Sequence, residues 1–223
     1  MNVSEAVGSR RSVRAFLDKP VPPEILREAL ELAARAPSGG NLQPWRLFVL
    51  AGQPLAELKK HMRQRLGSNP MPDPPDYHVY PEKLGEPYRT HRFEVGEAMY
   101  RLVGIPREDK MGRLRWLAGN YSFWGAPVGL FCYVDRKMGS PQWSDLGMYL
   151  QTLMLLLRER GVDTCPQEAW STFHKAVAEQ IKPPPEWMLF CGMAIGYEDP
   201  AAAVNKLKTT RAAVDQFTTF LGL

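Results

Sequence analysis

Arg10–Phe16 reads RRSVRAF, and it places three arginines and one serine in a short run. Because alternate side chains of an extended segment share a face, Arg10, Ser12 and Arg14 can point toward one ligand. Guanidinium groups bind phosphate in a bidentate geometry, and a serine hydroxyl adds another donor. The run therefore predicts an anion site, and its spacing alone leaves a solvated basic surface segment open as the alternative.

A second unusual stretch, PSGGNLQPW, covers residues 37–45. Its small residues 38–40 allow backbone N–H groups to approach a ring or a ribose. Asn41 and Gln43 offer amide donors and acceptors that suit the edge of a heterocycle. The stretch lacks both the GxGxxG spacing and a preceding strand, which disfavours a Rossmann dinucleotide site. A plain turn is the alternative reading.

The composition indicates one globular domain over residues 1–223, with 44% hydrophobic and 23% charged residues. Its longest apolar run, residues 149–157, is too short to span a membrane, and residues 1–12 lack a secretory signal, so we expect a cytoplasmic protein. The net charge of +4 is spread among acidic residues, which disfavours nucleic-acid binding. Three dispersed cysteines and four histidines without ligand spacing argue against a disulfide framework and a metal site.

Hydrophobic periodicity predicts several helices and few strands, hence an α+β fold with helices packed around a modest sheet. The helix expected at 21–37 has Pro23 in its first turn and ends before Pro37. The expected strands cover residues 45–50, 127–135 and 187–197. One further helix is expected after Gly52, and others at 92–105, 107–120, 144–160, 171–181 and 212–221.

Residues 68–87 form a proline-rich insertion, which we take as far as residue 90. An irregular segment of this length is either a lid or binding loop, or a solvated excursion. Residues 163–170 (DTCPQEAW) are expected to form another loop, in which Glu168 and the Ala169 amide meet a ring or cap a helix. A second basic cluster comprises Lys206, Lys208 and Arg211.

Taken together and in order, several segments closely resemble the nitroreductase superfamily of flavin-dependent reductases. They are RRSVRAF, APSGGNLQPWRLFVL, FWGAPVGL, DLGMYLQTLMLLLRERGVDTCPQEAW and NKLKTTR, and they cover nearly the whole chain except the insertion. The resemblance implies a three-layer fold with a central, mostly antiparallel sheet, assembled as an intertwined homodimer. It implies FMN as cofactor, whose anionic phosphate and flat ring would suit the two stretches quoted first.

The resemblance also assigns the cofactor-binding residues. Arg10 and Ser12 would face the phosphate and Arg14 the pyrimidine edge of the ring, with Arg11 nearby. A loop from the other subunit would complete the site. Its residues are Pro37, Ser38, Gly39, Asn41 and Gln43. The remaining assignments are Lys208 (with Lys206 as a rival) and Arg211 at the phosphate, Asn120 at the polar edge of the ring, and the ring-packing segment Pro166, Gln167, Glu168 and Ala169.

The activity implied is reduction of nitroaromatic or quinone-like acceptors, with NAD(P)H as electron donor and a ping-pong cycle. No protein side chain is expected to be catalytic, because hydride transfer takes place at FMN N5. A flavin-dependent reductive dehalogenase or enone reductase is the alternative. A non-enzymatic flavin- or nucleic-acid-binding protein is a remote one. The physiological acceptor, the choice between NADH and NADPH, and the role of the insertion remain open.

Overall fold

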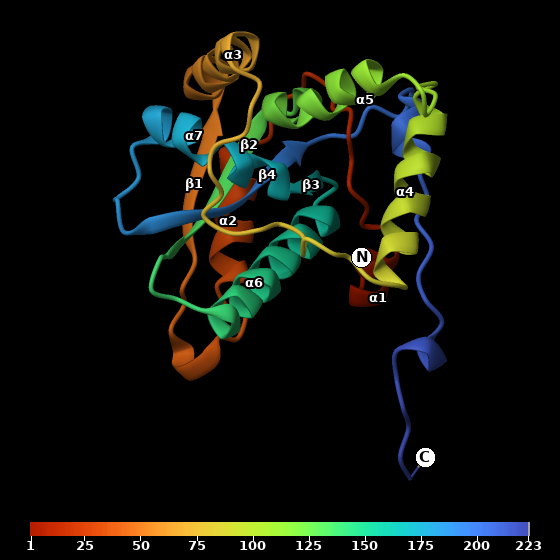
Figure 1. The fold of residues 1–223 in the computed structure, drawn as a ribbon. Coiled ribbons are helices and arrows are strands. Elements are labelled where there is room, and N and C mark those ends of the chain that lie inside the picture. The colour runs from red at the N-terminus through yellow and green to blue at the C-terminus, as the bar shows by residue number, and fades with distance from the viewer. Residues whose placement is uncertain (223) are drawn as a thin grey trace.

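The computed structural model describes residues 1–222, in which seven α-helices and five 3₁₀ turns surround one four-stranded sheet (Figure 1). The strands are β1 (Arg46–Ala51), β2 (Val128–Asp135), β3 (Asp163–Gln167) and β4 (Trp187–Gly196). The helices are α1 (Val3–Ser9), α2 (Pro23–Ala33), α3 (Gly52–Ser68), α4 (Tyr88–Leu102), α5 (Lys110–Leu117), α6 (Ser140–Glu159) and α7 (His174–Ile181). The 3₁₀ turns are η1 (Gly39–Asn41), η2 (Ala118–Gly125), η3 (Glu168–Phe173), η4 (Ala203–Lys206) and η5 (Val214–Gln216).

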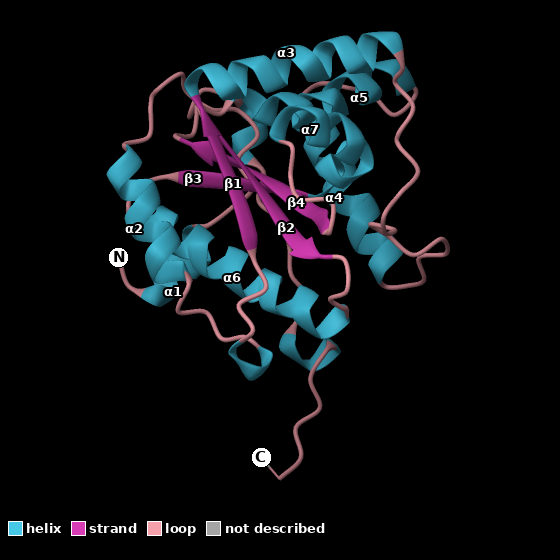
Figure 2. Cartoon of the chain, turned by 90° about the vertical axis from the view of Figure 1, so that its left-hand side faces the viewer, coloured by secondary structure: helices cyan, strands magenta, loops and turns pink. Residues whose placement is uncertain are grey.

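The sheet has the order β1-β2-β4-β3, and all its strand pairs are antiparallel. Its two central strands are buried on both faces, so side chains alternate between two cores. Leu130 and Cys132 of β2 point to the core under α2 and α6, whereas Phe131 and Tyr133 point to the core under α3 and α7. Figure 2 shows these two helical layers on opposite sides of the sheet. The predicted α+β class and antiparallel sheet are confirmed.

Helix α6 is the principal buried helix, as the apolar pattern of residues 144–160 predicts. It begins earlier, at Ser140, because Pro141 is accommodated in the first turn. Its residues Leu146, Leu153 and Leu157 are 0–1% exposed. The expected helix at 21–37 is α2, and the strands expected at 45–50, 127–135 and 187–197 are β1, β2 and β4.

Two local expectations are wrong. Residues 163–170 were expected to be a loop, but Asp163–Gln167 form β3 and pair with β4. Pro166 lacks an N–H group and is tolerated here because β3 is an edge strand. The helix expected at 212–221 is reduced to η5, since this tail leaves Phe217 and Leu221 71% and 88% exposed, with no core to pack against.

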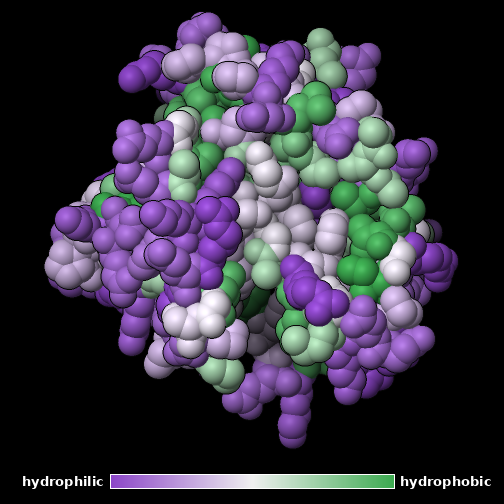
Figure 3. Space-filling model, turned by 90° about the horizontal axis from the view of Figure 1, so that it is seen from above, coloured by the Kyte–Doolittle hydropathy of each residue, from purple (hydrophilic) through white to green (hydrophobic). Residues whose placement is uncertain are grey.

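The outer surface is mixed. None of the helices in residues 1–222 is long and apolar enough to cross a membrane. Figure 3 looks down on the end of the molecule that carries α3 and α5, where polar side chains cover much of the surface and apolar ones gather in separate patches. Met111, Leu114 and Leu117 of α5 are among the exposed apolar residues.

Close packing against Trp170 leaves no space for a side chain at Gly192 of β4. A Cβ atom at residue 192 would lie 2.3 Å from Trp170 Cδ1, and this tryptophan is 0% exposed. We expect Gly192→Ala to lower the free energy of unfolding by ~1–3 kcal/mol, as overpacking does. Gly147→Ala is the control: this residue lies on the exposed face of α6 with nothing within 4 Å of the added atom.

That control should raise stability by ~0.5–1 kcal/mol, because alanine is the better helix former. Urea unfolding of both variants measures the two effects. A Gly192→Ala protein as stable as the wild type would show that the contact with Trp170 is looser than described.

Candidate functional site

The arginine segment adds an outer strand-like stretch beside β3. Arg10 caps the C-terminal end of α1, and Ser12 forms a parallel bridge with Thr164. The Val13 N–H group donates to the Thr164 carbonyl at 3.0 Å, and the Val13 side chain is fully buried. Burying Val13 leaves its two neighbours, Ser12 and Arg14, on the opposite side of the segment. The predicted alternation is therefore present.

Arg10, Ser12 and Arg14 gather around one buried thiol on β3. Burial raises the pKa of Cys165, while the Arg14 guanidinium, the Ser12 hydroxyl and the Arg10 guanidinium oppose that rise. Cys165 is 1% exposed, so its role is packing. The three predicted anion-binding side chains thus lie together.

Arg211 joins this group from the far end of the chain. Burial, and after it the neighbouring Arg211, lowers the pKa of Arg10. Arg211 donates to Thr209 Oγ1 and to the Thr210 carbonyl, both at 2.7 Å. Within residues 1–222, neither Arg10 nor Arg14 nor Arg211 forms an ion pair with a carboxylate. The result is a cluster of cations that lacks a counter-charge, which is the electrostatic signature of an anion site.

Arg11 has a different partner. It forms an ion pair with Glu198, on the segment that follows β4, and so lies apart from the cation cluster. Lys206 and Lys208 are both exposed, and no interaction in the described part of the chain separates their roles. The sequence analysis missed Asn205, which is 3% exposed: it accepts from the Arg14 N–H group at 2.9 Å and donates to the Ala15 carbonyl at 2.8 Å.

Asn205 therefore ties the C-terminal segment to the arginine segment. Its only sequence signal is an asparagine in a loop of the NKLKTTR run, and such residues commonly bind local backbone groups. The partner carbonyl and N–H group are about 190 residues away in sequence, since Arg14 and Asn205 are separated by 191 positions. Such a pairing has no local pattern.

The amide loop, residues 37–43, is exposed and holds an unusual backbone. Gly40, Asn41 and Gln43 have φ angles of 56°, 56° and 49°, in the left-handed region that non-glycine residues rarely adopt. Ser38 stabilises the turn, since its hydroxyl accepts from the Gln43 N–H group at 3.0 Å. Asn41 and Gln43 are exposed, with the Gln43 side-chain amide donating to the Asn41 carbonyl at 3.2 Å, and Pro37 and Gly39 are also exposed.

Within one chain this loop does not reach the cation cluster. The Gly39 N–H group donates to Asp145, near the start of α6, whereas Arg158, near its end, donates to Ser9 just before Arg10. The thirteen-residue separation of Asp145 and Arg158 corresponds to about 20 Å along a helix. Figure 1 shows the loop and α1 near opposite ends of α6.

The predicted ring-packing segment begins in β3 and continues into η3. Gln167 is buried, donates to the Asn120 carbonyl at 2.9 Å and to Asn120 Oδ1 at 3.1 Å, and accepts from Trp170 Nε1 at 3.3 Å. Asn120 and Gln167 are therefore brought together, and the Gln167 amide is used to fix the segment. Pro166 is exposed. Glu168 is exposed as a whole residue, but its carboxyl is partly desolvated, which raises the pKa of Glu168.

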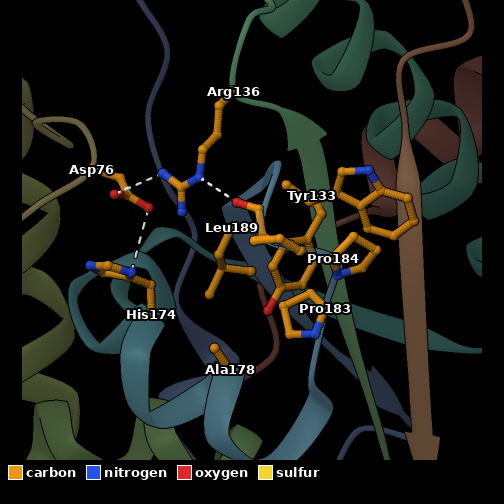
Figure 4. Close-up of a pocket in the computed structure, with 10 residues that line it drawn as sticks. Asp76, Tyr133, Arg136, His174, Ala178, Pro183, Pro184 and Leu189 are labelled. Atoms are coloured by element: carbon orange, nitrogen blue, oxygen red, sulfur yellow. Dashed lines mark hydrogen bonds and ion pairs between the residues drawn. The ribbon is translucent and has the colours of Figure 1, made fainter.

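The insertion docks directly on the element that follows this segment. Asp76 pairs with Arg136 at 3.0 Å and with His174 at 3.4 Å (Figure 4). Asp73 accepts from the Lys175 N–H group at 3.0 Å, and its own N–H group donates to the Thr172 carbonyl at 2.9 Å. These contacts fix residues 73–76 against η3 and the first turn of α7.

Tyr77 then turns into the core under α6. Its ring lies 5.3 Å from that of Trp143 and 6.2 Å from that of Phe190, and its hydroxyl donates to the Phe190 carbonyl. Burial raises the pKa of Tyr77 to about 12. The insertion is thus an ordered wall beside the candidate ring segment, and this observation favours the binding-loop reading over a solvated excursion.

Two cavities lie elsewhere. One, of about 100 Å³, is lined by Asp76, Arg136, His174, Tyr133 and the Pro183–Pro185 turn (Figure 4). The other, of about 390 Å³, lies between α3 and the segments around Pro20 and Ala126, and includes Lys59. Neither is lined by Arg10, Arg14 or Arg211. No group of three metal-binding side chains occurs in the described residues.

Comparison with known proteins finds similar proteins along nearly the whole chain. The family model described as "Nitroreductase family" matches residues 7–197. The chain is 35% identical to the chloronitrobenzene nitroreductase of Comamonas testosteroni, with 98% of this chain and 96% of that protein covered. It is 38% identical to the 4-nitrobenzoate reductase of Pseudomonas putida, with 97% and 94% covered.

Solved structures agree with these sequence matches. The FMN- and NADPH-dependent nitroreductase NfnB from Sphigopyxis sp. strain HMH superposes with a TM-score of 0.95 at 42% identity, over 100% of both chains. The FMN-dependent NfnB from Mycobacterium smegmatis, in complex with NADPH, superposes with a TM-score of 0.92 at 28% identity, over 98% and 97% of the two chains. From the fold, the cation cluster and these full-length matches, the chain belongs to the nitroreductase family.

Proposed function

We propose that the protein is an FMN-dependent oxidoreductase that uses NAD(P)H to reduce nitroaromatic or quinone-like acceptors. One observation carries the proposal: Arg10, Arg14 and Arg211 form a cation cluster without a counter-charge. A phosphate monoester would neutralise this cluster, and FMN carries one next to a flat ring. The full-length similarity to nitroreductases that are FMN- and NADPH-dependent supports this choice of anion.

Each side chain of the cluster then has a defined task. Arg10, Ser12 and Arg211 hold the phosphate by charge-assisted hydrogen bonds, and Lys208 adds positive charge from the tail. Arg14 directs its cation to the pyrimidine edge, where negative charge develops on reduction, and so favours the reduced state. When bound, FMN supplies the hydride exchange between NAD(P)H and the acceptor. Asn205 keeps the Arg14 backbone in place.

The segment from Pro166 to Ala169 provides the floor for the ring. Gln167 and Asn120 lock its conformation through two hydrogen bonds, so the exposed residues Pro166 and Glu168 have a fixed orientation. Ala169 suits this position, because a backbone N–H group facing the ring requires no particular side chain. This arrangement excludes water from one face of the ring by contact.

The active form in this proposal is an intertwined homodimer. The amide loop lies at the opposite end of α6 from the arginines of its own chain, yet it is exposed and held in a costly backbone conformation. A partner's loop that donates Asn41 and Gln43 across the interface explains both features. The tail of residues 207–222 extends away from the sheet and exposes Phe217, Phe220 and Leu221, an apolar set that a partner subunit would cover.

An aromatic acceptor suits the wall formed by the insertion. Relatives are described as reductases of chloronitrobenzene, 4-nitrobenzoate and nitrobenzene, and we extend nitroaromatic reduction to this chain. Tyr77 lies near Glu168 and Ser171, and its half-buried ring, which packs with Trp143 and Phe190, would supply aromatic surface beside the ring segment. We place the protein in the cytoplasm, because Cys132, Cys165 and Cys191 are all free and buried.

Removal of one phosphate ligand tests the cofactor site. We expect Arg10→Ala to stay folded and to bind FMN ~10- to 100-fold more weakly, because a hydrogen bond to a charged group contributes ~1.5–3 kcal/mol. Arg11→Ala is the matched control, because its side chain pairs with Glu198 outside the cluster. FMN fluorescence quenching during titration of each apoprotein gives the dissociation constants. Equal affinity in Arg10→Ala and the wild type would rule out this phosphate site.

Subunit mixing tests the shared site. Arg10→Ala dimers lack a phosphate ligand in both sites, and dimers of the double variant Asn41→Ala, Gln43→Ala lack both donated loops. A mixed dimer contains one intact site, formed by Arg10 of one subunit and the loop of the other. We therefore expect mixing to restore high-affinity FMN binding at half of the sites. No recovery, with heterodimers demonstrated by mass spectrometry, would place both elements in one chain.

A further inference from the structure

Asp145 is a buried carboxylate in the second turn of α6, and the proposed chemistry has no use for it. Asp145 is only 4% exposed, and Leu146 and Tyr149 of the same helix are also buried. Within residues 1–222 no lysine, arginine or histidine forms an ion pair with it. A buried carboxylate without a cation is costly, so its retention requires a specific hydrogen-bonding role.

Its hydrogen-bond partner is the backbone of the amide loop. The Gly39 N–H group donates to both carboxylate oxygens, at 3.2 Å to Oδ2 and 3.4 Å to Oδ1. Gly39 is the first residue of η1, and the three left-handed residues follow within four positions. Asp145 therefore binds the loop at the point where its unusual conformation begins.

The loop needs such an anchor because its backbone is strained. Non-glycine residues in the left-handed region cost ~1–3 kcal/mol each and persist only where the surroundings impose them, and both Asn41 and Gln43 are of this kind. Side chains hold the turn at several points: the Ser38 hydroxyl accepts from Gln43, Arg46 of β1 donates to the Gln43 carbonyl at 3.2 Å, and Asp145 accepts from Gly39. Among these side chains Asp145 is the buried one.

We propose that Asp145 is a positioning residue for the flavin site of the other subunit. It fixes the loop so that Asn41 and Gln43 project outward in one orientation, and it does so from about 20 Å away from the cation cluster of its own chain. The inference rests on the proposed FMN function and deepens it. It assigns the control of one subunit's cofactor to a buried carboxylate of its partner.

Three variants of the full-length holoenzyme test the role. Asp145→Leu removes both acceptors at similar volume, Asp145→Asn keeps one acceptor for Gly39, and Ser144→Ala changes the exposed neighbouring residue on the same helix. We expect Asp145→Leu to raise the FMN dissociation constant about tenfold, equal to ~1.4 kcal/mol. It should also shift the visible band and midpoint potential of the bound flavin. Asp145→Asn should recover most of both, and Ser144→Ala should match the wild type.

Gly39→Pro removes the donor instead of the acceptor. Proline suits this position, because Gly39 opens a 3₁₀ turn and Ser38 before it is extended at φ −145°, ψ 148°. If Asp145 acts through Gly39, the effects of Gly39→Pro and Asp145→Leu on FMN affinity should not add in the double variant. Gly39→Pro also keeps the inference testable if Asp145→Leu fails to fold, because it removes the same hydrogen bond from the loop side and should by itself raise the FMN dissociation constant about tenfold.

Mixing assigns the action to the partner's site. Dimers that combine an Asp145→Leu subunit with an Arg10→Ala subunit should regain the wild-type band and affinity at half of their sites. If wild-type protein binds no FMN, the proposed function fails. If the wild type binds FMN and Asp145→Leu shows the same affinity, visible band and potential, the function stands and this inference is wrong. Fully additive effects of Gly39→Pro and Asp145→Leu, or an unchanged FMN dissociation constant in Gly39→Pro, also overturn it.

Discussion

The candidate site depends on an unbalanced charge: Arg10 lies beside Arg211, Arg10 and Arg14 both lie near Cys165, and no carboxylate within residues 1–222 forms an ion pair with any of the three arginines. Three elements create this arrangement, namely the end of α1, the stretch bound to the edge of β3, and the tail tied down by Asn205. A chain that used these arginines for stability alone would pair them, as it pairs neighbouring Arg11 with Glu198. An anionic ligand explains the unpaired arginines, and the similarity to an FMN-dependent nitroreductase favours FMN as that ligand.

Helix α6 separates the two parts of the site that the proposed homodimer would bring together. Because it is long, straight through the core and buried, it separates the cation cluster from the amide loop by about 20 Å. The loop nonetheless holds two non-glycine residues in the left-handed region, and Asp145, Ser38 and Arg46 stabilise it through hydrogen bonds. This strained conformation has no evident role within one chain, and the proposed contribution of Asn41 and Gln43 to the partner subunit's flavin site would explain it. The insertion adds a third part, since Asp73 and Asp76 attach an aromatic wall to η3 and α7.

Most of the fold could be predicted from the sequence because its signals are local. Apolar periodicity located α2, α3 and α6, and β-rich runs located β1, β2 and β4. Strand β3 was missed because Pro166 and two acidic residues give Asp163–Glu168 the composition of a loop, and only its pairing with β4 makes it a strand. Of the site, the alternation of Arg10, Ser12 and Arg14 followed from an extended backbone. The roles of Asn205 and Asp145 did not, since their partners lie 191 and 106 positions away in sequence.

The central claim is that a reducible flavin occupies the cation cluster. The most direct measurement is the visible spectrum of the purified, desalted protein, recorded without oxygen before and after NADPH is added and again after a nitroaromatic acceptor is added. The proposal requires a flavin spectrum that bleaches with NADPH and returns with the acceptor. No flavin signal, even after incubation with FMN, would contradict the assignment of the cluster. A flavin spectrum that neither NADH nor NADPH bleaches would contradict the proposed reductase.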